Sequence, residues 1–95
     1  FGPVLSVLRW SDTEEVIEMA NGTEYGLTAG IWTNDVKTAM RTARRIESGC
    51  VWVNGGPRHF MSTGFAGYKN SGIGREECPD VLLSYTQSKS IHIIL

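Results

Sequence analysis

Three short apolar runs, separated by two helical patterns, constrain the fold of this chain more than any other feature. The runs cover residues 3–10 (PVLSVLRW), 27–33 (LTAGIWT) and 50–53 (CVWV), and each has the length of a strand. Strands separated by helices of about ten residues are typical of parallel sheets, because parallel neighbours need a crossover connection. The sequence therefore predicts an α/β fold with a parallel sheet.

Polar residues mark where the two helices begin and end. Ser11, with Glu14 three positions later, fits a capping box for the first helix, and Gly22 ends that helix. Asp35 is placed to cap the second helix, and Gly49 ends it. The basic residues between positions 41 and 45 fit either a phosphate patch or a solvated helix face, and we favour the solvated face.

A long glycine-rich segment follows the third strand. Residues 55–75 contain six glycines, together with Phe60, Phe65 and Tyr68. Loops of this length are usually functional or disordered, and the aromatic residues favour an ordered segment. A short helix is predicted over residues 76–84, with Pro79 in its first turn.

The last eleven residues, 85–95 (YTQSKSIHIIL), are predicted to form a final strand. Ile91, Ile93 and Leu95 would share one of its faces. The predicted order is strand, helix, strand, helix, strand, loop, helix, strand. This final strand follows a different kind of connection and need not join the parallel sheet.

Charge and hydropathy exclude two classes of partner. Nine basic and ten acidic residues leave a net charge of −1, which gives no basic surface for nucleic acid or anionic lipid. The apolar runs are far shorter than the ~18 residues of a membrane span. We expect neither a nucleic-acid partner nor a membrane partner.

The cysteines indicate a reducing compartment rather than a metal site. Two isolated thiols, Cys50 and Cys78, are fewer than small disulfide-stabilised secreted domains use, so a cytoplasmic protein is expected. His59 and His92 have no ligand spacing with either cysteine, and no metal is expected. The chain begins at Phe1 without a methionine, which indicates a piece of a longer protein.

Four segments in order carry a resemblance to the aldehyde dehydrogenase superfamily. Residues 1–4 (FGPV) resemble the end of its Glu-Ile-Phe-Gly-Pro-Val segment, and residues 49–54 (GCVWVN) resemble its Gly-x-Val-x-Val-Asn strand. Residues 65–76 (FAGYKNSGIGRE) resemble Phe-Gly-Gly-x-Lys-x-Ser-Gly-x-Gly-Arg-Glu, and residues 85–89 (YTQSK) match Tyr-Thr-x-x-Lys. The resemblance covers essentially the whole chain, with the spacing of the family's C-terminal part.

The resemblance implies oxidation of an aldehyde to a carboxylic acid with NAD or NADP. In the family a cysteine thiolate attacks the aldehyde, hydride passes to the nicotinamide, and a glutamate activates water. The resemblance places that cysteine, that glutamate and the Rossmann-like domain before Phe1, so the isolated chain is expected to be inactive and to hold no cofactor. It also implies that residues 1–84 belong to the catalytic domain, and that residues 85–95 form an oligomerisation strand that makes the protein a homo-oligomer.

The resemblance also assigns candidate site residues. Phe1 matches the phenylalanine that contacts the nicotinamide riboside, with a core residue at a strand start as the alternative. Phe65 matches the aromatic residue that helps to wall the aldehyde pocket, with a plain core role as the alternative. His59 and Phe60 lie where the family varies with its substrate, although a loop histidine such as His59 is more often merely solvated. These residues complete the predicted substrate pocket.

Two departures and two rejected motifs complete the comparison with the family pattern. Gly64 replaces a common proline, and Ala66 replaces the first glycine of Gly-Gly, so the pocket wall is expected to differ in shape. Neither Cys50, in a predicted strand, nor Cys78, beside two glutamates, matches the family's nucleophile. The Gly-x-Gly of residues 72–74 lacks a phosphate loop's remaining pattern and is expected to form turns.

These features leave two hypotheses about what the chain does. The first is that it forms part of an aldehyde dehydrogenase acting on a small aldehyde. The second is that the isolated chain is a self-associating interaction module, because residues 85–95 have the apolar character of an unpaired edge strand.

Overall fold

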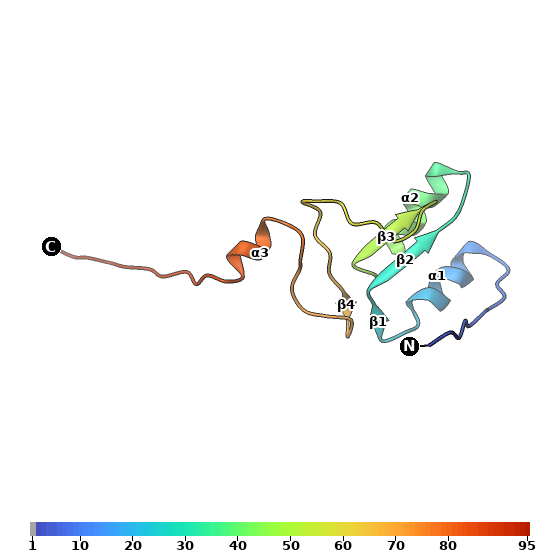
Figure 1. Ribbon diagram of the computed structural model, residues 1–95, viewed down its shortest axis with the longest axis horizontal. Coiled ribbons are helices and arrows are strands. Elements are labelled where there is room, and N and C mark those ends of the chain that lie inside the picture. Colours follow the sequence, from blue (N-terminus) through green and yellow to red (C-terminus); the bar gives the residue numbers. More distant parts are fainter. Residues whose placement is uncertain (1) are drawn as a thin grey trace.

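Short helices and strands alternate along the chain (Figure 1). The computed structural model describes residues 2–95. Its elements in order are α1 (Thr13–Asn21), β1 (Tyr25–Gly26), β2 (Thr28–Ile31), α2 (Val36–Arg45), β3 (Cys50–Val53), β4 (Tyr68–Lys69) and α3 (Asp80–Leu83).

A parallel pair, β2 and β3, forms the centre of the fold, with α2 as its crossover. The pairing runs from Thr28 opposite Cys50 to Ile31 opposite Val53. Asn54 extends it, because its backbone N–H donates to the Ile31 carbonyl at 2.8 Å. Its side chain also exchanges two hydrogen bonds with the backbone of Thr33, at 2.9 and 2.7 Å. The predicted parallel arrangement of these two strands is confirmed.

The first helix is capped one residue later than predicted. Asp12, not Ser11, is the N-cap, and its carboxylate accepts from the Glu15 N–H at 3.0 Å. Glu15 in turn accepts from the Ser11 N–H at 2.7 Å and the Ser11 hydroxyl at 2.6 Å. The reciprocal bonds of a capping box are therefore present in shifted form, since a carboxylate caps a helix at least as well as a serine hydroxyl. Gly22 ends the helix as predicted.

The second helix begins as predicted. The Asp35 carboxylate accepts from the backbone N–H groups of Lys37 and Thr38, at 3.0 and 3.1 Å. A hydrogen bond from the Thr38 hydroxyl and these two backbone bonds lower the pKa of Asp35, because all of them favour its charged form.

The two helices contact each other and pack beside the parallel pair. Ile17 of α1 and Ala39 of α2 are buried. At the surface, the Arg45 guanidinium donates to both carboxylate oxygens of Glu14, at 2.6 and 2.5 Å, and this bond lowers the pKa of Glu14. Arg45, from the basic cluster, thus links two helices on an exposed surface, in line with the predicted solvated face.

A second pairing, which the sequence did not predict, attaches the glycine-rich segment to the body. The two-residue strands β1 and β4 pair antiparallel, with Tyr25 opposite Lys69. The Lys69 ammonium donates to the Asn21 carbonyl at 2.7 Å and to the Thr23 carbonyl at 3.1 Å, and it pairs with Glu47 at 2.6 Å. Lys69 therefore connects β4 to the end of α1 and to the residues before β3.

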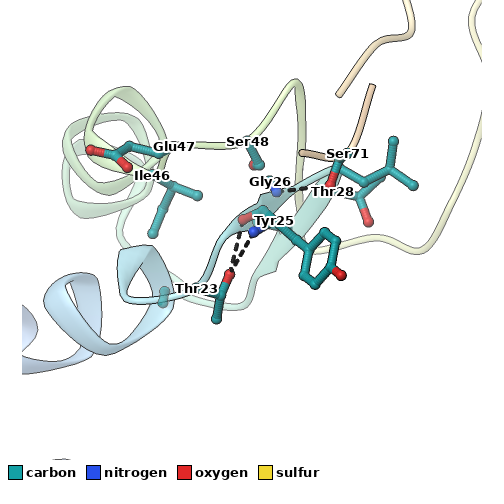
Figure 2. Close-up of a pocket in the computed structure, with 11 residues that line it drawn as sticks. Thr23, Tyr25, Gly26, Thr28, Ile46, Glu47, Ser48 and Ser71 are labelled. Carbon is teal, nitrogen blue, oxygen red and sulfur yellow. Dashed lines mark hydrogen bonds between the residues drawn. The ribbon is translucent and has the colours of Figure 1, made fainter. Parts of the chain in front are cut away.

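Three glycines allow the backbones around this pairing to approach closely. A Cβ at Gly49 would lie 1.7 Å from the Ala66 carbonyl oxygen, and one at Gly67 would lie 2.6 Å from Ser71. At Gly26 the nearest atom would be the Glu47 carbonyl oxygen, at 2.2 Å. Figure 2 shows the last region, where the Gly26 N–H donates to the Ser71 hydroxyl at 2.9 Å. Each of these contacts requires a residue without a side chain.

Two predicted strands do not form. Residues 3–10, expected to be a buried strand, are irregular, and their apolar side chains are exposed, for example Val4 at 87%. Residues 85–95 extend away from the body without forming a strand (Figure 1). A strand needs a neighbour to satisfy its backbone groups, and the described part of the chain pairs neither segment. The expected element order is therefore wrong at both ends.

The predicted helix over residues 76–84 is also shorter than expected. Only Asp80–Leu83 is helical, and Pro79 precedes it as a cap without a side-chain hydrogen bond. Glu77 has a φ of +63°, which is outside the helical range, so the helix cannot include it. Within residues 2–95, no helix combines the length and the hydropathy needed to cross a bilayer.

Replacing Gly49 with alanine is expected to destabilise the protein by about 1–3 kcal/mol, because the added Cβ must displace a backbone carbonyl rather than a flexible side chain. Gly56→Ala is the matched control, since a Cβ there meets no atom within 4 Å. Denaturant unfolding of the two variants measures the difference. Equal midpoints would contradict the close approach of Gly49 to Ala66.

Candidate functional site

A cavity beside β3 brings together the three residues predicted to form the substrate pocket. It has a volume of about 210 Å³ and lies between β3, the glycine-rich segment and the residues before α3. His59, Phe60 and Phe65 all line it. The remaining lining residues are Cys50, Val51, Trp52, Arg58, Thr63, Gly64 and Glu77.

Phe65 is held by its backbone. Its N–H donates to the Glu76 carbonyl at 2.9 Å, and the Glu76 N–H donates back to the Phe65 carbonyl at 2.8 Å, which forms an isolated antiparallel bridge. The side chain is half-buried. Phe65 also lines a larger cavity of about 500 Å³ on the way to α3, so its ring borders two spaces.

Gly64 and Ala66, the two residues that depart from the family pattern, do not strain the backbone next to Phe65. Ala66 is buried, and it is not among the described residues with a positive φ, so its Cβ is accommodated. A Cβ at Gly64 would lie 3.4 Å from the Arg75 side chain and 3.5 Å from the Cys78 sulfur. The backbone at Gly64 therefore passes close to the side chains of Arg75 and Cys78. The glycines at 72 and 74 have positive φ values of 156° and 85°, in keeping with the predicted turns.

The glycine-rich segment is ordered by its own hydrogen bonds before it reaches Phe65. The Trp52 indole N–H donates to the Arg58 carbonyl at 3.1 Å, which ties the start of the segment to β3. The Phe60 carbonyl accepts from the backbone N–H of Thr63 at 3.1 Å and from its hydroxyl at 2.5 Å. The Phe60 side chain is exposed at the mouth of this turn. Because the segment is hydrogen-bonded and lines a cavity, it is not a free linker.

His59 contacts the opposite side of the cavity. Its Nδ1 lies 2.7 and 2.8 Å from the two carboxylate oxygens of Glu77. Its ring lies against that of Phe65, with the centroids 4.9 Å apart and the planes tilted by 51°. The predicted solvated histidine therefore has a defined partner, although half of its side chain is exposed.

Sequence reasoning did not identify Glu77 or Trp52 as contributors to this site. Glu77 lies 18 positions after its partner His59. It directly follows the family motif that ends at Arg75-Glu76, and the motif does not include it. Trp52 lies inside a predicted strand, where a packing role is the default. The signal that did point to this region was the resemblance of residues 65–76 to the family motif.

The two cysteines lie on different sides of this region. Cys50 lines the cavity from β3, and Cys78 lies beside Pro79 in a neighbouring pocket. Both thiols are free and partly exposed. Among residues 2–95, no cluster of three or more His, Cys, Asp or Glu residues could hold a metal ion.

Phe1, the residue predicted to contact the cofactor, lies outside the described residues. Among residues 2–95, the buried side-chain polar atom without a hydrogen-bond partner is the Thr42 hydroxyl, in a cavity of about 410 Å³ that Trp10 and Trp32 also line.

Comparisons with known proteins identify the family of this chain. The model of the aldehyde dehydrogenase family matches residues 1–91. Aldehyde dehydrogenase tropH of Talaromyces stipitatus is 54% identical over 95 residues, and fluoroacetaldehyde dehydrogenase of Streptantibioticus cattleyicolor is 47% identical over 93 residues. These alignments cover 100% and 98% of this chain but 18% of each relative.

A solved structure gives the same result for the fold. The NAD⁺ complex of aldehyde dehydrogenase from Bacillus cereus superposes with a TM-score of 0.90 at 47% identity, over 96% of this chain and 18% of the other. Sequence and fold therefore agree over almost the whole length, and the α/β class is shared. The chain belongs to the aldehyde dehydrogenase family.

Proposed function

We propose that this chain is the C-terminal part of an NAD(P)-dependent aldehyde dehydrogenase, which oxidises an aldehyde to a carboxylic acid. The observation that carries the proposal is the match to the family over residues 1–91, together with relatives that are themselves named aldehyde dehydrogenases. The chain spans 18% of the length of those relatives. Its contribution is accordingly part of a site.

In this proposal the cavity beside β3 is one wall of the aldehyde pocket. Phe65 supplies an apolar aromatic surface, which excludes water and packs against the substrate tail. Phe60 lies at its entrance, where its exposure leaves it accessible to a ligand, and the ring of His59 packs against that of Phe65. The cavity combines apolar side chains, from Val51, Trp52, Phe60 and Phe65 among others, with the polar groups of Arg58, His59, Thr63 and Glu77.

The proposed cofactor is NAD or NADP. Solved relatives bound to NAD⁺, including the one from Bacillus cereus, favour NAD. Phe1 is the residue of this chain proposed to contact the nicotinamide riboside. The cofactor accepts the hydride when it is bound, and residues 2–95 contribute the pocket wall and the fold that supports it.

The isolated chain is proposed to be catalytically inactive. Neither Cys50 nor Cys78 matches the family's nucleophile, and its general base has no counterpart among the 95 residues. The two free thiols support a cytoplasmic location, where reducing conditions keep cysteines unpaired.

Activity and the role of Phe65 can be tested together. The intact protein is expected to reduce NAD with an aldehyde, whereas the 95-residue chain should give no reduction above a blank. Phe65→Ala in the intact protein should raise KM for aldehydes with a bulky apolar tail by about tenfold, because a buried aromatic contact contributes roughly 1.5–3 kcal/mol when complete.

Steady-state kinetics with a short and a bulky aldehyde measure this effect. An intact protein that reduces neither NAD nor NADP with any aldehyde would contradict the proposed activity. An unchanged KM for the bulky aldehyde in Phe65→Ala would instead remove Phe65 from the pocket wall.

A second proposed function is self-association through residues 85–95. The observation that favours it is the exposure of this extended segment, in which Ile91 and Ile93 are 74% and 77% exposed. Free backbone groups and apolar side chains together suit pairing with a strand of another copy. In the intact protein the same segment is proposed to act as the oligomerisation strand.

Light scattering coupled to size exclusion measures this association. The chain is expected to elute as an oligomer at high concentration, and Ile93→Pro should shift it toward the monomer, because proline removes a backbone donor from the ladder. Ser90→Ala, in the same segment, is the control and should leave the oligomer unchanged. A monomer at every concentration would contradict the role of this segment.

A further inference from the structure

Glu77 adopts a backbone conformation that a glutamate rarely adopts. Its φ is +63°, in the left-handed region that sterically favours glycine. Residues held in such conformations persist where the surrounding structure compensates, and they gather at functional sites. Here the residue immediately before Glu77 forms the backbone bridge to Phe65. The unusual conformation is therefore adjacent to the proposed pocket wall.

The Glu77 carboxylate has one partner, and the geometry of the contact is close. Both of its oxygens lie within 2.8 Å of His59 Nδ1. A carboxylate can only accept, so Nδ1 carries the proton and donates, and the bond is charge-assisted. This hydrogen bond fixes the imidazole ring, because it leaves one orientation in which Nδ1 faces the carboxylate.

The fixed imidazole lies against the ring of Phe65. The centroid separation of 4.9 Å and the tilt of 51° fall within the range that aromatic pairs prefer. Phe65 is therefore held on two sides, by its backbone bridge to Glu76 and by the ring of His59. The backbone bridge places the residue, and the contact with His59 limits where its side chain can turn.

The contacts of the fold do not depend on this pair. The parallel pairing of β2 and β3 and the hydrogen bond from Trp52 to Arg58 involve neither His59 nor Glu77. Both side chains are partly exposed, at 51% and 35%, and a polar contact at such a position adds little to stability. Their arrangement is thus better explained by what it does to Phe65 than by a contribution to folding.

We propose that His59 and Glu77 form a clamp that positions Phe65 as the wall of the aldehyde pocket. This inference rests on the proposed function, since Phe65 has a wall role only if an aldehyde binds there. His59 is then a positioning residue that acts through Phe65, rather than a polar contact to the substrate. The clamp sets the preference for aldehydes with a bulky apolar tail over short ones.

A double-mutant cycle in the intact protein tests the clamp. The variants are His59→Ala, Glu77→Gly and the two combined, where glycine accepts the positive φ and so removes the carboxylate without adding backbone strain. Each single variant should raise KM for a bulky apolar aldehyde by about three- to tenfold, since Phe65 must then be ordered on binding. The double variant should raise this KM no more than either single variant does.

The specificity pattern separates positioning from general damage. The KM values for acetaldehyde and for NAD, and kcat, should stay within about twofold of the original protein, because an ordered wall matters only to the tail of the substrate. Asp80→Asn is the control, since it removes a neighbouring carboxylate of the same segment. It should leave all of these values unchanged.

Three outcomes would overturn the inference. An effect of His59→Ala without an effect of Glu77→Gly would make His59 a direct substrate contact. Additive effects would show that the two residues act separately. Equal losses with short and bulky aldehydes would indicate damage to the fold, which the melting temperatures of the variants would also reveal.

The positioning of Phe65 can also be tested if the proposed activity is not found. If the original intact protein reduces neither cofactor with any aldehyde, crystal structures of the same variants test the clamp itself. A Phe65 ring that turns away from its original position in both single variants supports positioning, and an unmoved ring contradicts it.

Discussion

The parallel pairing of β2 with β3 is the constraint on which the rest of the structure depends. It sets Val53 opposite Ile31, and the hydrogen bonds of Asn54 then fix the point at which the glycine-rich segment leaves the sheet. The segment returns to the same body at Ala66, whose carbonyl lies so close to Gly49 that only glycine fits there. The candidate pocket wall is therefore fixed at both ends by backbone contacts.

From Asn54 onward the chain adopts several uncommon backbone conformations. Positive φ values occur at Asn54, Ser62, Lys69 and Glu77, none of which is glycine. Each such residue carries a conformational cost on the order of 1 kcal/mol, which the surrounding contacts must offset. Lys69 has three oxygen partners, so the contacts that offset the cost at this residue are visible as charge-assisted bonds. The segment is shaped by specific contacts rather than by hydrophobic burial.

Local patterns predicted the parts of the fold that depend on nearby residues. The Asp35 cap of α2 and the bounds of β3 follow from short-range chemistry, and both are confirmed. Residues 3–10 and 85–95 have the alternation of strands, but a strand forms only against a neighbour, which an apolar pattern does not supply. The same limit applies to the site. The family resemblance pointed to Phe65, Phe60 and His59, whereas the contact of His59 with Glu77 joins residues 18 positions apart, which no local pattern predicts.

In the proposed function, the cavity beside β3 that Phe65 lines is one wall of an aldehyde pocket in a larger enzyme. A crystal structure of the intact protein with NAD and a bound aldehyde analogue tests it most directly. In that structure the ring of Phe65 is expected to lie in van der Waals contact with the tail of the analogue, with His59 Nδ1 still bonded to Glu77. An analogue bound elsewhere, with Phe65 packed against protein alone, would exclude Phe65 from the pocket wall.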